Sequence, residues 1–394
     1  MSMPLARDAR AAPAVDRLKV LEFCDYYGVG SKGGTERVAR EVSRRLAGTG
    51  IDLAVVTALD GPAFADDGVP VHARPARDLS PLTGAQLSLA RGYHRWALRL
   101  ARTLAPDVIY AHSLHFQGSL VAARVSRRLR IPLVTVVHVA DLRSLSGRSR
   151  VLGEAWERTL GRFILSSSRR VVAVSEATAD HCRALGAAVP MTVVPNGVDH
   201  DRFVPAPPFA GLPTVTFVGR LIENKGPALL LAAADRLWAQ GHRFRVVFVG
   251  DGPLRAPLER VAASSRGEVR FVGHRNDVHA WLRRSHVVAR PSFTEGMPLT
   301  VLETMASARC AVVSDIAPHR ELVDHLYDGI LHRVGDVNDL ADKLALVLAD
   351  PELRDRVASS AAWTAREYTW DRTATGHHDA LRSAVSERVA SRAG

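Results

Sequence analysis

Two acidic residues separated by seven positions form the most specific chemical pattern in the sequence. Glu295 precedes the segment Gly-Met-Pro-Leu-Thr-Val-Leu, and Glu303 follows it. A helix predicted over Pro298–Ala308 begins inside this segment, because proline suits a first helical position that needs no N–H. Backbone N–H groups at its start would hold an anion, while the two carboxylates would accept hydrogen bonds from a neutral diol. The pattern predicts a ligand that carries both phosphate and sugar hydroxyl groups.

A cationic loop lies earlier in the same half of the chain. Gly219-Arg220-Leu-Ile-Glu-Asn-Lys225-Gly226 follows an apolar run, Thr214–Val218, that is predicted to be a strand. Lysine is rare in this protein, since only 4 of the 52 basic residues are Lys. Arg220 and Lys225 at the end of a strand are suited to neutralise phosphate. Open parallel sheets bind their ligands at the carboxyl ends of strands, so the loop and the helix start are expected to share one site.

A second glycine-rich loop lies near the N-terminus. The spacing Gly28-x-Gly30-x-x-Gly33 matches a dinucleotide fingerprint, so an NAD(P)- or FAD-dependent oxidoreductase is one alternative. Two features count against it. Four residues separate the strand from Gly28, and the acid after the second strand, Asp60, follows Gly33 by 27 positions rather than about 20. A P-loop is excluded because Gly34 replaces its lysine. We expect Gly33 and Gly34 to present N–H groups to a ligand.

The composition is that of a folded protein with room for two domains. Of 394 residues, 47% are hydrophobic and 24% are charged, which excludes a disordered chain. No apolar run reaches the roughly 18 residues of a membrane span, and the N-terminal segment lacks the apolar core of a signal peptide. We therefore expect a cytoplasmic protein. Cys24, Cys182 and Cys310 are too far apart for a disulfide framework or a zinc site.

Metal binding is not predicted either. The single D-x-D sequence, Asp199-His-Asp201, falls in a predicted linker and is interpreted as a turn.

Short apolar runs alternate with segments of helical period, which predicts α/β domains with parallel sheets. The predicted strands are Leu18–Phe23, Leu53–Thr57, Val108–Ala111, Leu133–Val139, Val171–Val174, Thr192–Val194, Thr214–Val218, Arg245–Val249, Val269–Val272, Val287–Arg290 and Ala311–Ser314. The predicted helices include Glu36–Leu46, Gln86–Leu104, Ala228–Gln240, Pro298–Ala308 and Asn338–Leu348. The runs are apolar throughout rather than alternating, so helices should cover both faces of each sheet.

Domain boundaries follow from a proline-rich break in this alternation. The predicted divisions are a flexible arm over 1–15, a first Rossmann-like doubly wound domain over 16–195, a linker over 196–213, a second Rossmann-like domain over 214–369 and a helix over 370–394. We expect the two domains to face each other across a cleft.

The sequence resembles the retaining glycosyltransferases of family 4 over most of its length. In the second half, the motifs that carry the resemblance are Glu295-x7-Glu303, Gly219-Arg220-Leu…Lys225-Gly226, Gly250-Asp-Gly252-Pro253 and Phe271-Val-Gly273. The other motifs similar to that family are Gly33-Gly34-Thr35-Glu36, Pro195-Asn196-Gly197-Val198-Asp199 and Tyr368…Trp370. The resemblance implies a GT-B architecture, a nucleotide-sugar donor in the second domain and a final helix that crosses back to the first.

The resemblance also implies roles for individual residues. Glu303 would bind ribose hydroxyls, and Arg220 and Lys225 would neutralise the diphosphate. Glu295 would hold the transferred sugar, which His138 would face from the first domain. Residues expected to act in catalysis are His138, Arg220, Lys225 and Glu295. Residues expected to bind the donor are Gly219, Arg220, Lys225, Gly273, Glu295, Gly296, Met297, Pro298, Leu299, Thr300 and Glu303. In many family members an acid follows the histidine directly, whereas here Val139 and Ala140 precede Asp141.

The expected reaction moves a sugar from a nucleotide-diphosphate sugar to a hydroxyl acceptor with retention, by front-face attack, and requires no metal or other cofactor. A nucleotide-sugar epimerase of the same fold is an alternative, as are the oxidoreductase and a non-catalytic basic binding protein.

The net charge of +11 is concentrated in one segment of the first half. Arg124–Arg170 holds 11 Arg against three acids. Nucleic acid is not the expected partner, because few aromatic residues are interleaved with these cations. We expect this segment to contact an anionic membrane surface peripherally, or a charged acceptor.

Overall fold

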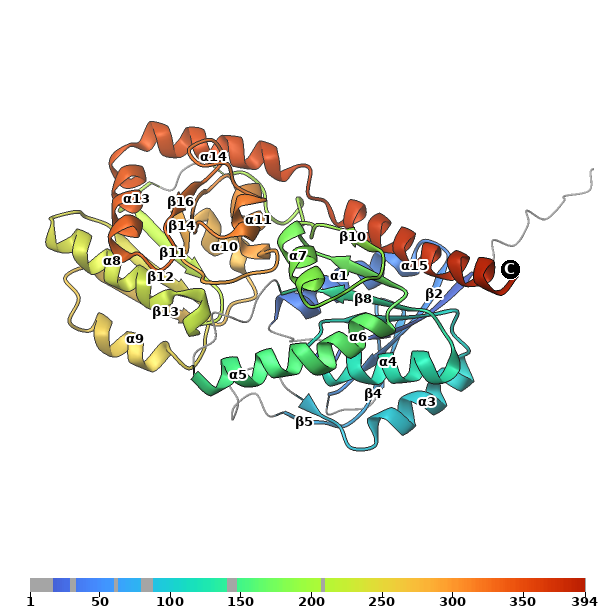
Figure 1. Ribbon diagram of the computed structural model, residues 1–394. Coiled ribbons are helices and arrows are strands. Elements are labelled where there is room, and N and C mark those ends of the chain that lie inside the picture. Colours follow the sequence, from blue (N-terminus) through green and yellow to red (C-terminus); the bar gives the residue numbers. More distant parts are fainter. Residues whose placement is uncertain are drawn as a thin grey trace, which may run out of the picture.

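The computed structural model describes residues 17–28, 33–59, 63–78, 88–139, 147–206 and 210–393. Figure 1 shows two α/β domains, the first coloured blue to green and the second yellow to red, with the last helix returning to the first domain. Each domain is built on a sheet whose central strands are almost entirely buried, because helices cover both faces. The predicted fold class, two doubly wound Rossmann-like domains, is confirmed.

The first sheet has eight strands in the order β10-β9-β8-β7-β1-β2-β4-β3. Neighbouring strands are parallel, except for the antiparallel pair β3 and β4 at one edge. The strands are β1 (Leu18–Phe23), β2 (Ile51–Thr57), β3 (Phe64–Asp66), β4 (Val69–Ala73), β7 (Val108–His112), β8 (Leu133–Val137), β9 (Arg170–Ala173) and β10 (Met191–Val193). A separate antiparallel ribbon consists of β5 (Arg77–Asp78) and β6 (Ser88–Leu89).

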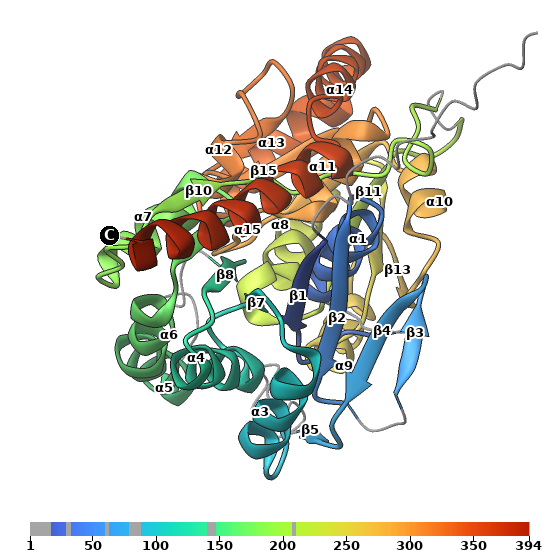
Figure 2. The ribbon, with the colours of Figure 1, turned by 90° about the vertical axis from the view of Figure 1, so that its right-hand side faces the viewer.

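Helices of the first domain divide between the two faces of this sheet, as Figure 2 shows from the side. The helices are α1 (Gly34–Ala47), α3 (Tyr93–Leu104), α4 (Gln117–Leu129), α5 (Gly147–Trp156), the π-helical turn η1 (Glu157–Gly161), α6 (Arg162–Ser167) and α7 (Glu176–Ala184). One face packs on α3, α4 and α6, and the opposite face packs on α1 and the C-terminal helix.

The second sheet has six parallel strands in the order β13-β12-β11-β14-β15-β16. Its strands are β11 (Thr214–Val218), β12 (Arg245–Val249), β13 (Glu268–Gly273), β14 (Val287–Arg290), β15 (Cys310–Ser314) and β16 (Ile330–His332). Its helices are the 3₁₀ turn η2 (Glu223–Lys225), α8 (Pro227–Ala239), α9 (Arg255–Ala262), α10 (Val278–Arg283), α11 (Leu299–Ala306), α12 (Ala317–Arg320), α13 (Val337–Ala349) and α14 (Pro351–Ala365). Two separate apolar cores lie on the two faces of this sheet. One is covered by α8 and α13, and the other by α10 and α11.

The C-terminal helix α15 (Trp370–Ala393) crosses from the second domain and packs on α1, β7, β8 and β9 of the first (Figure 1). Ala380, Leu381 and Ala384 are buried in this contact. Two ion pairs flank it, Arg45 Nε to Asp371 Oδ1 at 3.0 Å and Arg170 Nη2 to Glu387 Oε1 at 2.6 Å.

Several predicted elements need correction. The helix predicted over Gln86–Leu104 is wrong at its start, because β6 occupies Ser88–Leu89 and α3 begins only at Tyr93. Gly92 lies between them with a φ of +67°, a left-handed backbone that breaks a continuous helix. The helix predicted over Pro298–Ala308 is shorter, since Pro298 is the N-cap of α11. The strand predicted over Leu133–Val139 ends at Val137, just before His138.

Candidate active site

Three side chains hold Glu295 in the loop that follows β14. The Oε2 atom of Glu295 accepts a hydrogen bond from Lys225 Nζ at 2.6 Å. Its Oε1 atom accepts from Arg290 Nε at 2.9 Å and from the Ser292 hydroxyl at 2.8 Å. Glu295, Arg290 and Ser292 are buried, and Lys225 is half-buried. The second sheet therefore carries one carboxylate and two cations in contact at its carboxyl edge.

The charges in this cluster shift the pKa of one another. Burial by itself raises the pKa of Glu295, but Arg290 and Lys225 together lower it by more, and the result is well below the ordinary value. Burial lowers the pKa of Lys225, while Glu295 opposes that shift and Arg290 adds to it. Glu295 is therefore an anion with both oxygens already engaged. Such a carboxylate accepts hydrogen bonds but is a poor base and a poor nucleophile.

Two glycines allow the cationic loop to close on β14. Gly219 has a φ of +148°, and a Cβ there would lie 2.2 Å from Arg290 Nη1. Gly226 has a φ of +66°, and its Cβ would lie 2.1 Å from the carbonyl oxygen of Pro291. Any other residue at either position would strain the backbone and collide with its neighbour. The glycines that flank Arg220 and Lys225 are thus needed to bring these cations to Glu295.

The guanidinium of Arg220 makes no hydrogen bond or ion pair with any residue that the structure describes. It is half-buried, and its charge helps to lower the pKa of Lys225, which places the two cations near each other. Gly273 ends β13 at the same edge with a φ of +73°, and its carbonyl oxygen accepts from Gly250 N at 2.8 Å. A ligand at this edge can therefore engage the Arg220 guanidinium without displacing a partner among the described residues.

The start of α11 packs closely against the first domain. A Cβ on Gly296 would lie 1.9 Å from the carbonyl oxygen of His138, so only glycine fits there. The carbonyl of Gly296 accepts from the Ser175 hydroxyl at 2.9 Å, and that of Met297 accepts from Asn196 Nδ2 at 3.1 Å. Among the described residues, no hydrogen bond uses the N–H of Gly296 or of Met297. Ser175 and Asn196 therefore fix the carbonyl groups, and these two N–H groups are available to an anion.

Glu303, the second acid of the motif, forms an ion pair with the first domain. Glu303 is buried on α11, and its Oε1 atom accepts a hydrogen bond from Arg37 Nη1 of α1. Thr300, one turn earlier on α11, is half-buried. The structure thus brings Lys225 and Glu295 into direct contact, whereas Glu303 contacts the first domain instead.

In the first domain, His138 lies directly after β8, and its Nε2 is 3.0 Å from Nδ1 of His112. Gly33 is the N-cap of α1 with an extended φ of −107°. A Cβ on Gly33 would lie 1.9 Å from Oε2 of Glu36, so a larger residue there would require the Glu36 side chain to move. A Cβ on Gly34 would meet nothing within 4 Å. Gly30 of the dinucleotide-like spacing lies outside the described residues, as do Asp60 and Asp141.

Comparison with known proteins identifies the family. Residues 32–202 match the family described as Glycosyltransferase Family 4, and residues 212–350 match the family described as Glycosyl transferases group 1. The two matches fall on the two domains, and the chain is a glycosyltransferase. This assignment does not favour the oxidoreductase alternative based on Gly28, Gly30 and Gly33.

Two curated relatives and one solved structure illustrate the similarity of this glycosyltransferase to known proteins. D-inositol 3-phosphate glycosyltransferase of Kribbella flavida is 28% identical over 93% of this chain and 94% of its own. UDP-Gal:alpha-D-GlcNAc-diphosphoundecaprenol alpha-1,3-galactosyltransferase of Escherichia coli is 27% identical over 81% of this chain and 86% of its own. Anabaena Alr3699/HepE, solved with UDP and glucose, has a TM-score of 0.75 at 22% identity over 93% of this chain and 100% of its own, which shows a common fold.

Several residues that contact the predicted site residues, or act on their charge, were not predicted from the sequence, and Arg290, Arg37 and His319 are among them. Arg290 is the last residue of a strand, Arg37 lies on a distant helix, and His319 belongs to α12. His319 is buried with Nδ1 2.8 Å from the carbonyl oxygen of Ser314. Burial lowers the pKa of His319 to about 4, although Glu295 opposes the shift. Of these three residues, only Arg290 had a signal in the sequence, because it is a basic residue at the end of an apolar strand.

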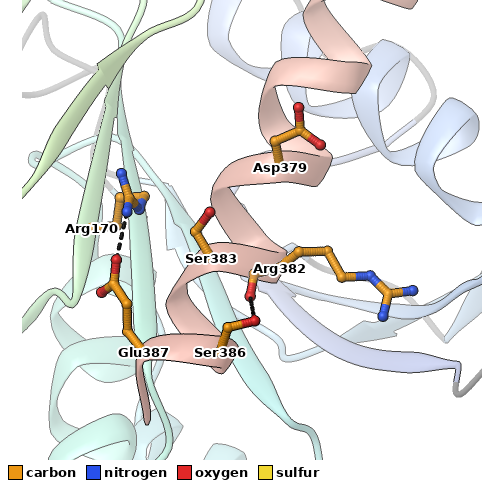
Figure 3. A pocket seen from close by; sticks show the side chains of 6 residues that line it. All are labelled: Arg170, Asp379, Arg382, Ser383, Ser386 and Glu387. Carbon is orange, nitrogen blue, oxygen red and sulfur yellow. Dashed lines mark hydrogen bonds and ion pairs between the residues drawn. The ribbon is translucent and has the colours of Figure 1, made fainter. Parts of the chain in front are cut away.

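A pocket at the edge of the first domain does not belong to this site. Figure 3 shows it between Arg170 and helix α15, where the lining residues are Arg170, Asp379, Arg382, Ser383, Ser386 and Glu387. None of the predicted site residues lines this pocket.

Within the described part of the glycosyltransferase, no three His, Cys, Asp or Glu side chains are arranged to hold a metal ion. No helix of that part has the length and apolarity needed to cross a bilayer. Several arginines of the segment Arg124–Arg170 have partners, since Arg169 and Arg170 pair with Glu387 and Arg162 donates to the carbonyl of Leu185. The exposed ones include Arg124, Arg127, Arg128 and Arg130 on and just after α4.

Proposed function

We propose that this glycosyltransferase moves a sugar from a nucleoside diphosphate sugar to a hydroxyl acceptor, with retention and without a metal ion. The observation that carries the proposal is the contact of Glu295 with both Lys225 and Arg290, beside the start of α11. A rigid carboxylate next to cations and unused N–H groups suits a ligand that carries hydroxyls and phosphates together. Similar proteins act on or bind molecules of this chemical class, since one is named for the donor UDP-Gal and another was solved with UDP and glucose.

The diphosphate leaving group would be stabilised by charges already present at this edge. Arg220 and Lys225 would bind its oxygens, and the N–H groups of Gly296 and Met297 would add hydrogen bonds at the helix start. Gly219, Gly273, Pro298, Leu299 and Thr300 would shape the surrounding donor surface. Because negative charge on the phosphate grows as the glycosidic bond breaks, these groups would act mainly on the rate of transfer.

Retention would follow from attack on the front face of the sugar. A double displacement needs a free protein nucleophile, and Glu295 is unsuited because all its oxygens are engaged and its pKa is low. The bond from the sugar C1 to the phosphate oxygen would break with its electron pair on the phosphate. The acceptor oxygen would bond to C1 on the same face, and its proton would pass to the departing phosphate oxygen.

The remaining residues would position the two substrates. Glu303 would accept hydrogen bonds from ribose hydroxyls, and His138 would face the transferred sugar from the first domain. Gly33 and Gly34 at the start of α1 would lie on the acceptor side. We further propose a cytoplasmic enzyme whose first domain contacts an anionic membrane face peripherally.

One experiment separates this function from the epimerase and the non-catalytic alternatives. A thermal-shift screen of UDP, GDP and ADP and their sugars should raise the Tm with one nucleotide family, because ligand binding stabilises the folded state. NMR of the product made from the best donor should show a new glycosidic bond with the anomeric configuration of the donor. An isomerised donor with no acceptor product would support the epimerase, and inversion would contradict front-face attack.

Addition of EDTA should leave the rate of transfer nearly unchanged, whereas a loss of activity that a divalent cation restores would contradict metal independence.

A further inference from the structure

The hydroxyl group of Ser175 connects the first domain to the loop that begins α11. Ser175 is the N-cap of α7 and has an extended backbone with a φ of −158°. Its Oγ atom lies 2.9 Å from the carbonyl oxygen of Gly296, 3.1 Å from the N atom of Thr178 and 2.8 Å from Oγ1 of Thr178. All three residues are buried. One serine thus joins the start of a first-domain helix to a peptide group of the candidate site.

These three contacts leave the hydroxyl of Ser175 a single orientation. A serine hydroxyl has one hydrogen to donate and two lone pairs that accept. The carbonyl oxygen of Gly296 can only accept and the N–H of Thr178 can only donate, so the hydrogen of Ser175 points at Gly296. The hydroxyl of Thr178 then donates to the second lone pair. Every hydrogen-bonding position of this side chain is filled, and the hydroxyl cannot rotate without losing a bond.

The carbonyl group of Gly296 shares a peptide plane with the N–H of Met297. The described residues contain no cis peptide bond, and in a planar trans peptide the C=O and the N–H point in opposite directions. A bond that fixes the carbonyl of Gly296 on Ser175 therefore also fixes the N–H of Met297, which points away from Ser175. Met297 is buried, and no hydrogen bond among the described residues uses this N–H. Because buried residues rarely leave an N–H without a partner, this one is suited to a ligand.

Two further contacts limit the movement of this peptide. Nδ2 of Asn196 donates to the carbonyl oxygen of Met297 at 3.1 Å, which fixes the next peptide group along the chain. On the other side, the carbonyl oxygen of His138 packs so closely on Gly296 that a Cβ there would lie 1.9 Å from it. The peptide between Gly296 and Met297 belongs to the second domain but is held by residues of the first domain and the linker.

We propose that Ser175 is a positioning residue that aims the N–H of Met297 at the sugar-linked phosphate of the donor. The ligand in this statement rests on the proposed function, whereas the fixed direction of the N–H does not. Glu295, the proposed sugar ligand, lies two residues before Met297, so the phosphate that reaches this N–H is the one bonded to the sugar. Because Ser175 belongs to the facing domain, the N–H is aimed only while the two domains are in contact.

The N–H of Met297 can be observed by itself. The chain has 5 methionines, so ¹⁵N-methionine labelling leaves few NMR signals, and Met297→Leu assigns the signal of interest. The probe is inorganic pyrophosphate. In the natural protein it should move the amide proton signal of Met297 downfield, because an N–H that donates to a charged oxygen forms a short, strong hydrogen bond.

Ser175→Gly removes the hydroxyl but keeps a favourable N-cap, since glycine is also preferred at that position. In this variant the downfield shift should be largely lost, and pyrophosphate should bind roughly tenfold more weakly. With the best donor of the panel, kcat should fall roughly tenfold and KM should change less, because the phosphate gains charge as the glycosidic bond breaks. Ser175→Cys, whose thiol is a weak donor of nearly the same shape, should give the same direction of change without relying on the stability of the glycine variant.

Two controls separate aiming from helix capping. Ser175→Thr keeps both the hydroxyl and the cap, so it should retain the shift and the affinity. Asp350→Gly is the matched control, because Asp350 is the N-cap of α14, where it accepts from Leu353 N at 2.9 Å. Among the described residues, Asp350 makes no hydrogen bond to the loop of Met297. This variant should leave the Met297 signal and the affinity unchanged.

The proposal is overturned if pyrophosphate leaves the Met297 signal of the natural protein in place, or if the glycine and cysteine variants respond to pyrophosphate as the natural protein does. If pyrophosphate moves the signal but no nucleotide sugar of the panel binds, the role of Ser175 stands and the proposed function fails.

Discussion

Arg37 of the first domain donates to Glu303 of the second, and this ion pair joins α1 to α11 across the domain boundary. The side chain of Glu303 is only 5% exposed, whereas that of Arg37 is 32% exposed. The guanidinium of Arg37 also lies over the ring of Phe203, 5.7 Å from its centroid. The carboxylate proposed to bind ribose is therefore already occupied by a side chain of the facing domain.

We predict that Glu303→Ala weakens donor binding without unfolding the protein. Each hydrogen bond from a ribose hydroxyl to this carboxylate is worth about 1.5–3 kcal/mol. Calorimetry with the nucleoside diphosphate should show a loss of roughly tenfold or more. Glu321→Ala is the control, because Glu321 also bridges the domains but accepts from the N–H groups of Glu176 and Ala177. Unchanged affinity in the Glu303 variant would remove this residue from the site.

Arg37→Met should have the opposite effect on affinity. The methionine keeps an apolar stem over Phe203 but no longer competes with ribose for the carboxylate of Glu303. A partly exposed ion pair contributes about 1 kcal/mol at most, so nucleotide should bind roughly threefold to fivefold more tightly. The Tm of the ligand-free variant should fall slightly. Weaker nucleotide binding would show instead that Arg37 contacts the donor.

The two loop cations should affect turnover more than binding. Lys225→Met and Arg220→Ala remove charges that meet the growing charge of the leaving group, so kcat should fall roughly 100-fold for each. Arg243→Ala, an exposed cation of the same domain, serves as the control. Steady-state kinetics with the best donor provide the measurement. A double variant with the kcat/KM of the natural protein would show that the loop is merely solvated.

Acid should unfold the protein partly through Glu157. His115 and His181 each place Nε2 on Oε1 of this buried carboxylate, at 2.9 and 3.1 Å. Burial alone raises the pKa of Glu157, but the two histidines lower it to about 2 from an ordinary 4.5. A lowered pKa contributes stability above pH 4.5 that is lost as the pH falls toward 2, in total about 3 kcal/mol.

The free energy of unfolding, measured with urea, should therefore differ most between the natural protein and Glu157→Gln near neutral pH. This difference should shrink as the pH falls below 4.5. A difference that does not depend on pH would assign the role of Glu157 to packing.

The exposed arginines on and after α4 should bind anionic vesicles. Each cation near an anionic leaflet contributes about 1 kcal/mol, and salt screens the attraction. Flotation should recover the protein with phosphatidylserine vesicles at low salt but not with neutral vesicles. Arg127→Glu combined with Arg128→Glu should abolish recovery, whereas Arg366→Glu on the second domain should not. Equal behaviour with anionic and neutral vesicles would exclude the membrane contact.

The fold was largely predictable because its strands are short, continuous and apolar. β1, β11, β12 and β14 begin and end at the predicted residues, since turn-forming or polar residues bound each run. The short β3 and β16 were missed, because three residues carry too little pattern to distinguish a strand from a loop.

The site residues could be predicted only where they belong to a local sequence motif. Lys225 and Glu295 were predicted from motif spacing, and the structure brings them into contact. The pairing of Arg37 with Glu303 depends on how two domains are placed, which local patterns do not encode. The contact of Ser175 with Gly296 depends on the same placement. A single sequence shows such residues only as ordinary core positions.

Helix α15 has a consequence for the order in which the chain can fold during synthesis. One face of the first sheet is complete only when Ala380, Leu381 and Ala384 pack on it, although its strands end at Val193. At 5–20 residues per second, the ribosome takes roughly 10–40 s to make the intervening chain. During this interval the first domain would emerge with an uncovered apolar face. A nascent chain arrested before α15 should therefore be held by a chaperone or aggregate, whereas the released full-length chain can close that face itself.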